Sequence, residues 1–190
     1  LGYSSPKTQS RTYLYNLKTK EKKLVKEQEI PSGHNPEDYI VERLECKSHD
    51  GRLIPLTITR HKETKIDGTA NVLLFGYGSY GNSLPFGSFS SSRLSLLNRN
   101  IIWCDASVRG GRERGEVWHE EGKMLNKKNT FEDYISATKF LIEKKYTYKG
   151  GILGYGGSAG GLLMGAVINQ APELFLGMVI QVGFLDNLTT

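Results

Sequence analysis

The pattern of apolar and polar positions along the chain changes near residue 38. Before that point, an alternating segment at 12–17 and its return at 22–26 predict a two-stranded β-hairpin. A hairpin is only marginally stable on its own, so we expect it to belong to a larger sheet. The segment that follows it is rich in proline, serine and glycine and is interpreted as a linker.

Beyond residue 38, short apolar runs alternate with segments of helical spacing. Such a series is typical of an α/β protein with a mostly parallel sheet and helices on both faces. The expected strands are 39–46, 53–59, 71–75, 101–104, 151–153 and 178–182. The expected helices are 92–98, 131–144, with Asn129 or Thr130 as its cap, and 159–170.

Composition places the chain among ordinary globular proteins. Of its 190 residues, 38% are hydrophobic and 24% are charged, which excludes disorder, collagen and coiled coil as descriptions of the whole chain. The net charge is +5, but the densest basic run, 18–26, is interleaved with Glu21. We interpret this run as a solvated face, so neither nucleic acid nor a membrane surface is an expected partner. The longest apolar stretch, 174–180, is too short to cross a bilayer.

The location predicted from the sequence is cytoplasmic. The first residues lack the basic start and apolar core that mark a secretory signal. Cys46 and Cys104 are far apart and fit no metal or redox spacing, which favours a reducing compartment over a disulfide framework.

A G-x-S-x-G motif spans 156–160, where it follows an expected strand and opens an expected helix. This is the context of a nucleophile elbow, although a glycine-rich turn with an incidental serine is the alternative. In an elbow the serine takes a strained conformation, and side chains at Gly156 and Gly160 would collide. The Ser158 hydroxyl then projects above the sheet, and the Ala159 N–H can face a developing oxyanion.

A second glycine motif, G-x-G-x-x-G at 76–81, has the layout of a dinucleotide fingerprint. It follows an expected strand, and Asp105 follows the next one, where the fingerprint places an acid. The fingerprint also needs a helix that opens at its third glycine, and Pro85 and Gly87 argue against such a helix. A dinucleotide-binding α/β domain therefore stays an alternative rather than the favoured interpretation.

Several short segments occur in a fixed order along nearly the whole chain. They are FGYGSYG at 75–81, SSSRL at 90–94, RGG at 109–111, GKMLNKKNTFED at 122–133 and GGSAGGLLMGAV at 156–167. Together they resemble the prolyl oligopeptidase family of serine peptidases, and within it the oligopeptidase B branch. The resemblance implies an α/β-hydrolase catalytic domain capped by a β-propeller, of which the hairpin before the hydrolase part would be a remnant. It also implies cleavage of short peptides after Lys or Arg in the cytoplasm, without cofactor or metal.

The resemblance assigns roles to four residues. Ser158 would be the nucleophile, with the Tyr77 hydroxyl and the Ala159 N–H as the two oxyanion donors. Tyr80 stands where the family lines its substrate pocket with an aromatic ring. The implied organisation is a remnant of the last propeller blade, a linker and a truncated hydrolase domain, at 1–30, 31–38 and 39–190.

The other members of a catalytic triad are not found in the expected order, which is Ser, then Asp or Glu, then His. All four histidines precede Ser158, and the acids after it are Glu173 and Asp186, of which Asp186 is interpreted as a loop residue. A serine without a base is a poor nucleophile, and loss of the base typically costs on the order of a million-fold in rate. The chain alone is therefore expected to be inactive. The alternative is a non-catalytic remnant, or a subunit that needs a partner chain.

The last expected strand, 178–182, would leave an apolar edge on the sheet. Such an edge tends to aggregate or to pair with another chain. We therefore expect self-association through this edge, or binding of a chain that carries further strands.

Overall fold

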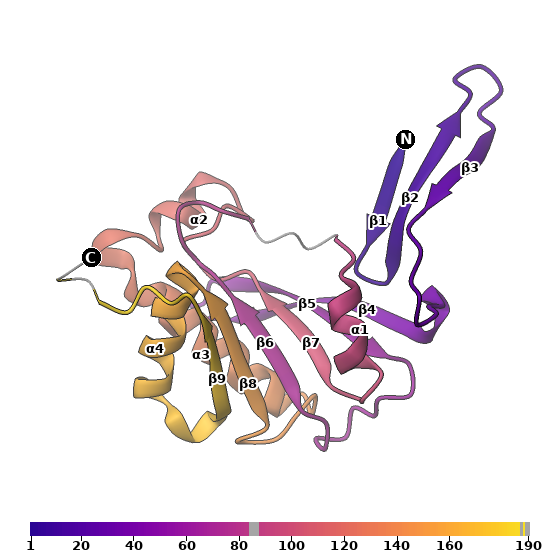
Figure 1. Ribbon diagram of the computed structural model, residues 1–190. Coiled ribbons are helices and arrows are strands. Elements are labelled where there is room, and N and C mark those ends of the chain that lie inside the picture. The colour runs from indigo at the N-terminus through magenta and orange to yellow at the C-terminus, as the bar shows by residue number, and fades with distance from the viewer. Residues whose placement is uncertain (84–87, 187, 189–190) are drawn as a thin grey trace.

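The computed structural model describes residues 1–83, 88–186 and 188. It contains a small antiparallel sheet, which projects from the molecule, and a larger six-stranded sheet (Figure 1). The small sheet has the order β1-β2-β3, and its strands are β1 (Gly2–Ser5), β2 (Thr8–Tyr15) and β3 (Lys22–Glu27). The prediction of a two-stranded hairpin was one strand short. β1 pairs with β2 but is too short to show an alternating pattern.

The larger sheet has the strand order β4-β5-β7-β6-β8-β9. Strands β7, β6, β8 and β9 are parallel, as the alternation of strands and helices predicts, whereas β4 and β5 are antiparallel and form one edge. Among the described residues, strand β9 forms the other edge, as the sequence predicts for the last strand. The strands are β4 (Tyr39–Lys47), β5 (Leu53–His61), β6 (Val72–Gly76), β7 (Ile102–Ala106), β8 (Ile152–Gly157) and β9 (Phe175–Gln181).

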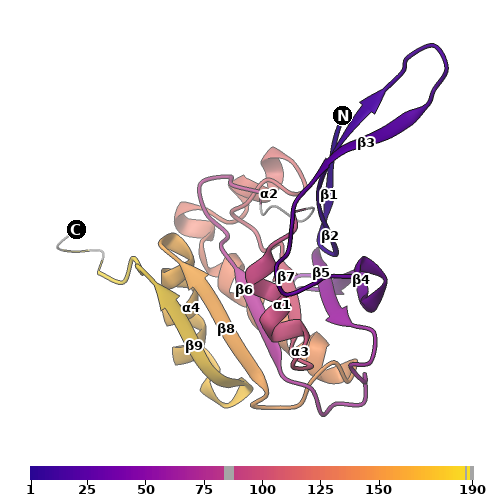
Figure 2. The ribbon, with the colours of Figure 1, turned by 45° about the vertical axis from the view of Figure 1, so that its right-hand side comes forward.

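Helices cover both faces of the larger sheet, which confirms the α/β class (Figures 1 and 2). On one face, α1 (Ser91–Leu97) contributes to a cluster with Leu73 and Trp103. On the other face, α3 (Lys128–Glu143) and α4 (Ala159–Gln170) build the main core. None of the described helices combines the length and the apolar character that a membrane span needs. Shorter helices between the strands include α2 (Glu116–Glu120), η2 (Met124–Asn126) and η3 (Pro172–Leu174).

The start of α3 differs from the prediction that Asn129 or Thr130 caps it. The helix already begins at Lys128, and Lys127 at the N-cap has helical backbone angles and no capping hydrogen bond from its side chain. The Thr130 hydroxyl instead lies 2.8 Å from the carbonyl oxygen of Arg109, and Asn129 donates to the carbonyl oxygen of Glu121. The cap prediction was wrong because both side chains bind a neighbouring loop rather than the end of their own helix.

The segment between the two sheets packs against both of them. It contains a 3-10 turn, η1 (Pro36–Asp38), which is capped by Asn35. The His34 Nε2 lies 2.8 Å from the carbonyl oxygen of Lys7, and the His34 ring stacks on Tyr39 with 5.0 Å between the ring centroids. These contacts hold the small sheet beside the edge of the larger one.

Candidate active site

Ser158 lies at the sharp turn between β8 and α4. Its backbone angles are φ 52° and ψ −118°, a conformation that costs energy for any residue with a side chain. Three hydrogen bonds of 2.9 Å hold the turn: the Ser158 N–H donates to the Gln181 carbonyl, and the Ser158 carbonyl accepts from the N–H groups of Gly161 and Phe184. The Ser158 side chain is exposed. The turn therefore presents a hydroxyl to solvent beyond the carboxyl end of β8, an inner strand of the sheet.

The glycines on either side of Ser158 leave no room for side chains. A Cβ atom on Gly156 would lie 2.3 Å from the carbonyl oxygen of Gly160, and a Cβ atom on Gly160 would lie 2.8 Å from the carbonyl oxygen of Gly76. Both values are below the 3.0 Å that Cβ atoms tolerate. The close approach of strand and helix at this turn thus depends on both residues being glycine.

The loop after β6 lies directly against this turn. A Cβ atom on Gly160 would be 3.4 Å from Cδ2 of Tyr77, so the Tyr77 ring contacts the first turn of α4. Tyr77 is half-buried, whereas Tyr80 is 72% exposed and has a positive φ of 57°. The structure thereby places Tyr77 beside the Ser158 turn and leaves Tyr80 open to solvent.

A hollow of about 590 Å³ joins the loop, the segment before α3 and the start of α4. Tyr80 and Ala159 line it, together with residues that the sequence did not suggest for the site, among them His119, Lys127 and Phe184. The Ala159 N–H is at the first position of α4, where a helix offers it no internal acceptor. The hollow therefore combines an available backbone donor with aromatic and basic side chains.

A base for Ser158 is not found among the described residues. No hydrogen bond joins the Ser158 hydroxyl to a described histidine or carboxylate, and the Nδ1 of His119, the histidine that lines the hollow, lies 3.0 Å from the carbonyl oxygen of Gly110. The Asp186 carboxylate accepts from the backbone N–H of Leu188 in an exposed loop. Within the described part of the chain, the site therefore contains an exposed serine with the Ala159 N–H and the Tyr77 ring close to its turn, but no general base.

The alternative of dinucleotide binding finds no support in the environment of Asp105. The Trp103 Nε1–H donates to Asp105 Oδ1 at 2.8 Å, and Asp105 is 3% exposed. Burial raises the pKa of this carboxyl, although the charge of Arg93 and the Trp103 hydrogen bond oppose that shift. An acid buried in this way is not free to bind a ribose.

The helix that the fingerprint needs is also not found where the structure describes the chain. The two described residues that follow Gly81 are Asn82 and Ser83, and they open no helix. Pro85 and Gly87, on which the sequence argument against a helix rests, lie outside the described residues. The described part of the glycine motif therefore ends in a loop rather than at a helix N-terminus.

One group of side chains has the composition of a metal site. Glu116, His119 and Glu120 bring potential ligand atoms within 4.8 Å of one another on α2. However, Glu116 pairs with Arg112 at 2.9 Å and Glu120 pairs with Lys123 at 2.5 Å. Both carboxylates are therefore already neutralised by neighbouring cations.

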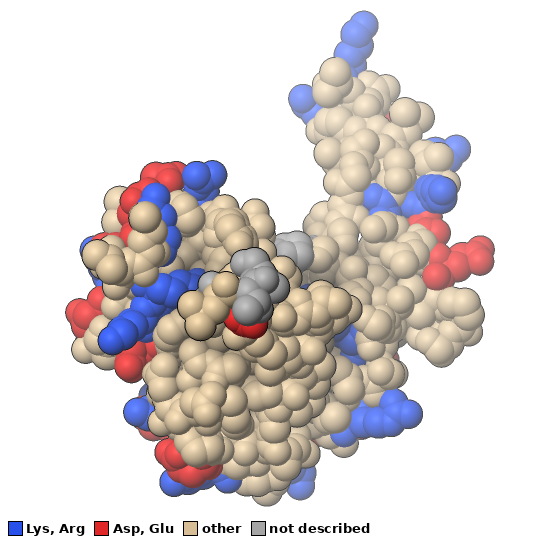
Figure 3. Space-filling view, turned by 60° about the vertical axis from the view of Figure 1, so that its left-hand side comes forward, with Lys and Arg blue, Asp and Glu red and all other residues tan. Residues whose placement is uncertain are grey.

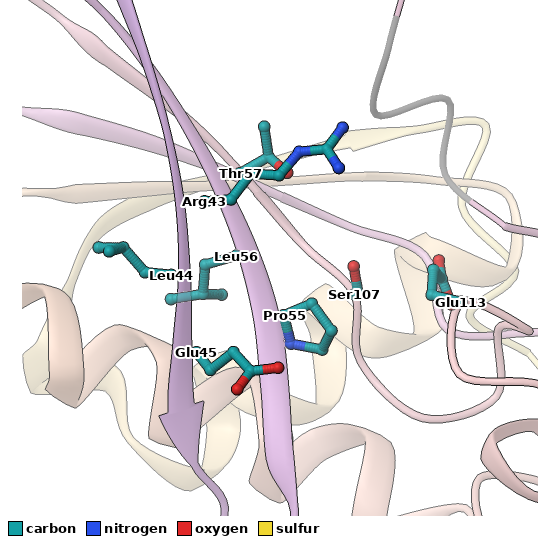
Figure 4. Close-up of a pocket in the computed structure, with 8 residues that line it drawn as sticks. All are labelled: Arg43, Leu44, Glu45, Pro55, Leu56, Thr57, Ser107 and Glu113. Carbon is teal, nitrogen blue, oxygen red and sulfur yellow. The ribbon is translucent and has the colours of Figure 1, made fainter.

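A second hollow, of about 680 Å³, lies away from the Ser158 turn (Figure 4). Figure 4 shows Glu45 and Pro55 from β4 and β5, with Ser107 and Glu113 from the segment that follows β7. None of the residues predicted for the active site lines it. It is therefore separate from the candidate active site.

The chain belongs to the prolyl oligopeptidase family, which is a family of serine peptidases. The sequence model of this family matches residues 87–190. It is 42% identical over 190 residues to dipeptidyl aminopeptidase BI of Pseudoxanthomonas mexicana, covering 100% of this chain and 26% of that protein. It is 42% identical over 191 residues to protease 2 of Moraxella lacunata, of which it covers 27%.

Solved structures agree with this assignment. Oligopeptidase B from Leishmania major has a TM-score of 0.89 and 38% identity over 97% of this chain and 26% of that one. Oligopeptidase B from Trypanosoma brucei has a TM-score of 0.90 and 35% identity over 98% of this chain and 26% of that one. The chain thus spans about a quarter of the length of these relatives.

Proposed function

We propose that this chain provides the nucleophile and the oxyanion donors of a serine oligopeptidase. The observation that carries the proposal is the conformation of Ser158: an exposed serine at positive φ, between an inner parallel strand and a helix, beside the Tyr77 ring. The oligopeptidase B structures from Leishmania major and Trypanosoma brucei share this fold. Gly156 and Gly160 allow the turn, and Ala159 and Tyr77 supply the N–H and O–H donors.

In the proposed reaction, Ser158 Oγ attacks the carbonyl carbon of a peptide bond, and its proton passes to a general base. The Ala159 N–H and the Tyr77 hydroxyl stabilise the charge that develops on the carbonyl oxygen. The amine then leaves with the proton, and water hydrolyses the ester on Ser158. Tyr80, exposed at the rim of the hollow, contacts the side chain of the substrate.

The chain alone is proposed to be inactive, because the base is not among its described residues. The base and its carboxylate partner come from residues of a longer or second polypeptide, and a non-catalytic role is the alternative if none supplies them.

The substrates are short peptides cleaved after Lys or Arg, as the resemblance to oligopeptidase B implies. In the same view, residues 1–30 belong to the last blade of a β-propeller and 31–38 are the linker to the hydrolase domain at 39–190. The buried free thiols of Cys46 and Cys104 fit a cytoplasmic setting.

The test of this proposal is labelling by a fluorophosphonate, which reacts with an activated serine. The chain is compared alone and fused to the segment that follows the matched region in protease 2 of Moraxella lacunata. We expect no adduct on the chain alone and one adduct on Ser158 in the fusion, detected by intact mass and peptide mapping. The variant Ser158→Ala should lose the adduct, and Ser95→Ala, on exposed α1 surface, should keep it.

Either expectation can fail separately. An adduct on Ser158 of the chain alone would show that a base reaches the serine without a partner, and the proposed inactivity would be wrong. A folded fusion that stays unlabelled would remove Ser158 from the role of nucleophile.

We further propose that the edge of β9 pairs with another strand, from a second copy or from a chain that carries further strands. Strand β9 pairs only with β8 in the described part of the molecule, and it exposes Leu176 by 63% and Val179 by 41%. A broad surface without charge lies on the side of the molecule where α4 and β9 lie (Figure 3). An apolar edge of this kind favours pairing with another strand.

Introducing a charge at this edge is expected to weaken association. We expect Val179→Lys to raise the dissociation constant of self-association about tenfold, because the ammonium must be desolvated when the edge is covered. Sedimentation velocity over a range of concentrations measures this constant. The control is Leu17→Lys, which changes another exposed apolar residue, in the small-sheet turn. If the wild-type chain stays monomeric at all concentrations, self-association through β9 is wrong.

A further inference from the structure

Lys127 reaches from the start of α3 to the loop that carries Tyr77 and Tyr80. Its Nζ donates to the carbonyl oxygen of Gly78 at 2.5 Å and to the hydroxyl oxygen of Ser79 at 2.8 Å. Both acceptors lie between the two tyrosines in the sequence. Lys127 also lines the hollow that contains Ala159 and Tyr80. The ammonium therefore contacts the middle of the loop from the side of the proposed active site.

The Lys127 ammonium has no carboxylate partner within the described residues, and both of its acceptors are neutral. Burial lowers the pKa of Lys127 to about 8. The neighbouring Lys128, by contrast, is exposed. Burying an ammonium without a counter-charge costs free energy, so stability alone does not account for this placement. Perturbed groups of this kind concentrate at functional sites.

The loop that Lys127 contacts has an unusual backbone. Gly78, Tyr80 and Gly81 all have positive φ, at 66°, 57° and 64°. A Cβ atom on Gly78 would lie 2.4 Å from Cγ2 of Thr130, so the loop is pressed against α3. A conformation of this kind persists only where surrounding contacts impose it. Besides Lys127, the Gly110 carbonyl helps to hold the loop in this conformation, because it accepts a hydrogen bond from the Gly81 N–H at 2.9 Å.

We propose that Lys127 is a positioning residue that fixes the Gly78–Ser79 segment and thereby holds Tyr77 and Tyr80 in place for the reaction at Ser158. Its importance for catalysis rests on the proposed function, whereas its effect on the loop does not. Lys127 acts through the loop and touches none of the reacting atoms. Loss of its hydrogen bonds releases the backbone between the two tyrosines, and the oxyanion donor at Tyr77 is then less well placed.

Two variants separate this role from a general effect of losing a lysine. Lys127→Met keeps the length of the side chain and removes its donors, and Lys128→Met does the same at the exposed neighbour. Hydrogen exchange measured by mass spectrometry should be about tenfold faster over residues 77–82 in Lys127→Met and unchanged in Lys128→Met. Equal exchange in the two variants would overturn the proposal.

The catalytic effect is measured in the fusion that labels at Ser158. We expect Lys127→Met to lower the maximal rate of fluorophosphonate labelling about tenfold. The fluorophosphonate concentration that gives half of this rate should change little, because misplaced catalytic groups affect the reaction step more than binding. If wild-type fusion does not label, the proposed function fails, and hydrogen exchange still decides the role of Lys127. If it labels and Lys127→Met labels equally fast, the positioning role in catalysis is wrong.

Restoring the amine provides a third test. Lys127→Cys treated with 2-bromoethylamine regains an amine at the same reach, while Cys46 and Cys104 are both buried. We expect aminoethylation to return loop exchange and the labelling rate most of the way to wild type. If the folded, aminoethylated variant recovers neither the loop exchange nor the labelling rate of the wild type, the amine of Lys127 does not have the proposed role.

A milder substitution covers the case in which Lys127→Met does not fold. Ser79→Ala removes one of the two acceptors and should raise loop exchange by less than Lys127→Met does. In a background of Lys127→Met, adding Ser79→Ala should have no further effect, because the interaction is already absent. Ser79→Ala without any effect on the exchange of residues 77–82 would contradict the proposed contact.

Discussion

Replacing Asp133 with asparagine is expected to lower the free energy of unfolding by about 3 to 5 kcal/mol, the usual cost of breaking a buried ion pair from one side. Asp133 on α3 is completely buried and Arg109 is 1% exposed. The Arg109 side chain donates to both carboxylate oxygens, at 2.9 Å to Oδ2 and 2.6 Å to Oδ1. The Arg109 backbone N–H and the Ser48 hydroxyl donate to the same carboxylate, at 2.9 and 2.5 Å.

The size of this effect follows from the number of hydrogen-bond donors that point at the Asp133 carboxylate. An amide in place of the carboxylate turns an N–H₂ group toward donors of Arg109 or Ser48. The guanidinium then keeps the partly exposed Asp50 but loses its one fully buried counter-charge. The hydrogen bonds with Asp133 and Asp50 outweigh the desolvation of Arg109 and raise its pKa, so the guanidinium does not escape the penalty by losing its proton. The cost of leaving the charged guanidinium without Asp133 therefore appears as a lower free energy of unfolding.

The measurement is urea unfolding followed by circular dichroism, with Glu116→Gln as the control. Glu116 also pairs with an arginine, Arg112, but both side chains are more than half exposed, and such pairs contribute roughly 0 to 1 kcal/mol. If Asp133→Asn destabilises the protein no more than Glu116→Gln, the buried pair does not support the fold as argued. A double change of Arg109→Leu with Asp133→Leu should cost less than the sum of the two single changes.

The buried pair also connects the fold to the site. Arg109 precedes Gly110, whose carbonyl accepts from the Gly81 N–H and lies beside His119 Nδ1. The Arg109 carbonyl in turn lies 2.8 Å from the Thr130 hydroxyl on α3. Loosening the pair should thus disturb the same loop that Lys127 contacts.

Features with a strong local pattern could be predicted from the sequence. The parallel strands, the helix at Ala159–Gln170 and the edge strand follow from apolar runs, small residues and glycine turns, and the structure has them. The Ser158 turn could be proposed for the same reason, because strand, glycines and helix are contiguous in the chain. Short or polar elements such as β1 carry no such pattern and were missed.

Features that depend on tertiary contacts could not be predicted. Thr130 has the composition of a helix cap, but its hydroxyl binds the Arg109 carbonyl, which is close only after folding. Lys127 and Lys128 are identical in type and adjacent, yet one is half-buried against a loop and the other is exposed. Nothing in the local sequence separates them, because the difference arises from how α3 docks on the sheet.

Replacing Gly156 with alanine is expected to lower the free energy of unfolding by about 2 to 3 kcal/mol, near the upper end of what overpacking usually costs. The added Cβ would lie 2.3 Å from the carbonyl oxygen and 2.7 Å from the carbonyl carbon of Gly160. Both atoms are backbone at the first turn of α4, so neither can rotate away as a side chain would. Relief requires α4 to move away from β8, which also displaces Ser158 and the Ala159 N–H.

The adjacent Gly157 provides the control for this prediction. A Cβ atom there would lie 3.4 Å from the Gln181 carbonyl oxygen, an ordinary contact, and Gly157 has no positive φ. We expect Gly157→Ala to change stability by roughly 0.5 kcal/mol or less, as most substitutions without a packing or backbone conflict do. Urea unfolding of the two variants compares sites one residue apart in the same strand. Equal stability of the two would mean that β8 and α4 separate readily at this turn, and the close packing proposed to hold Ser158 would not be what fixes its position.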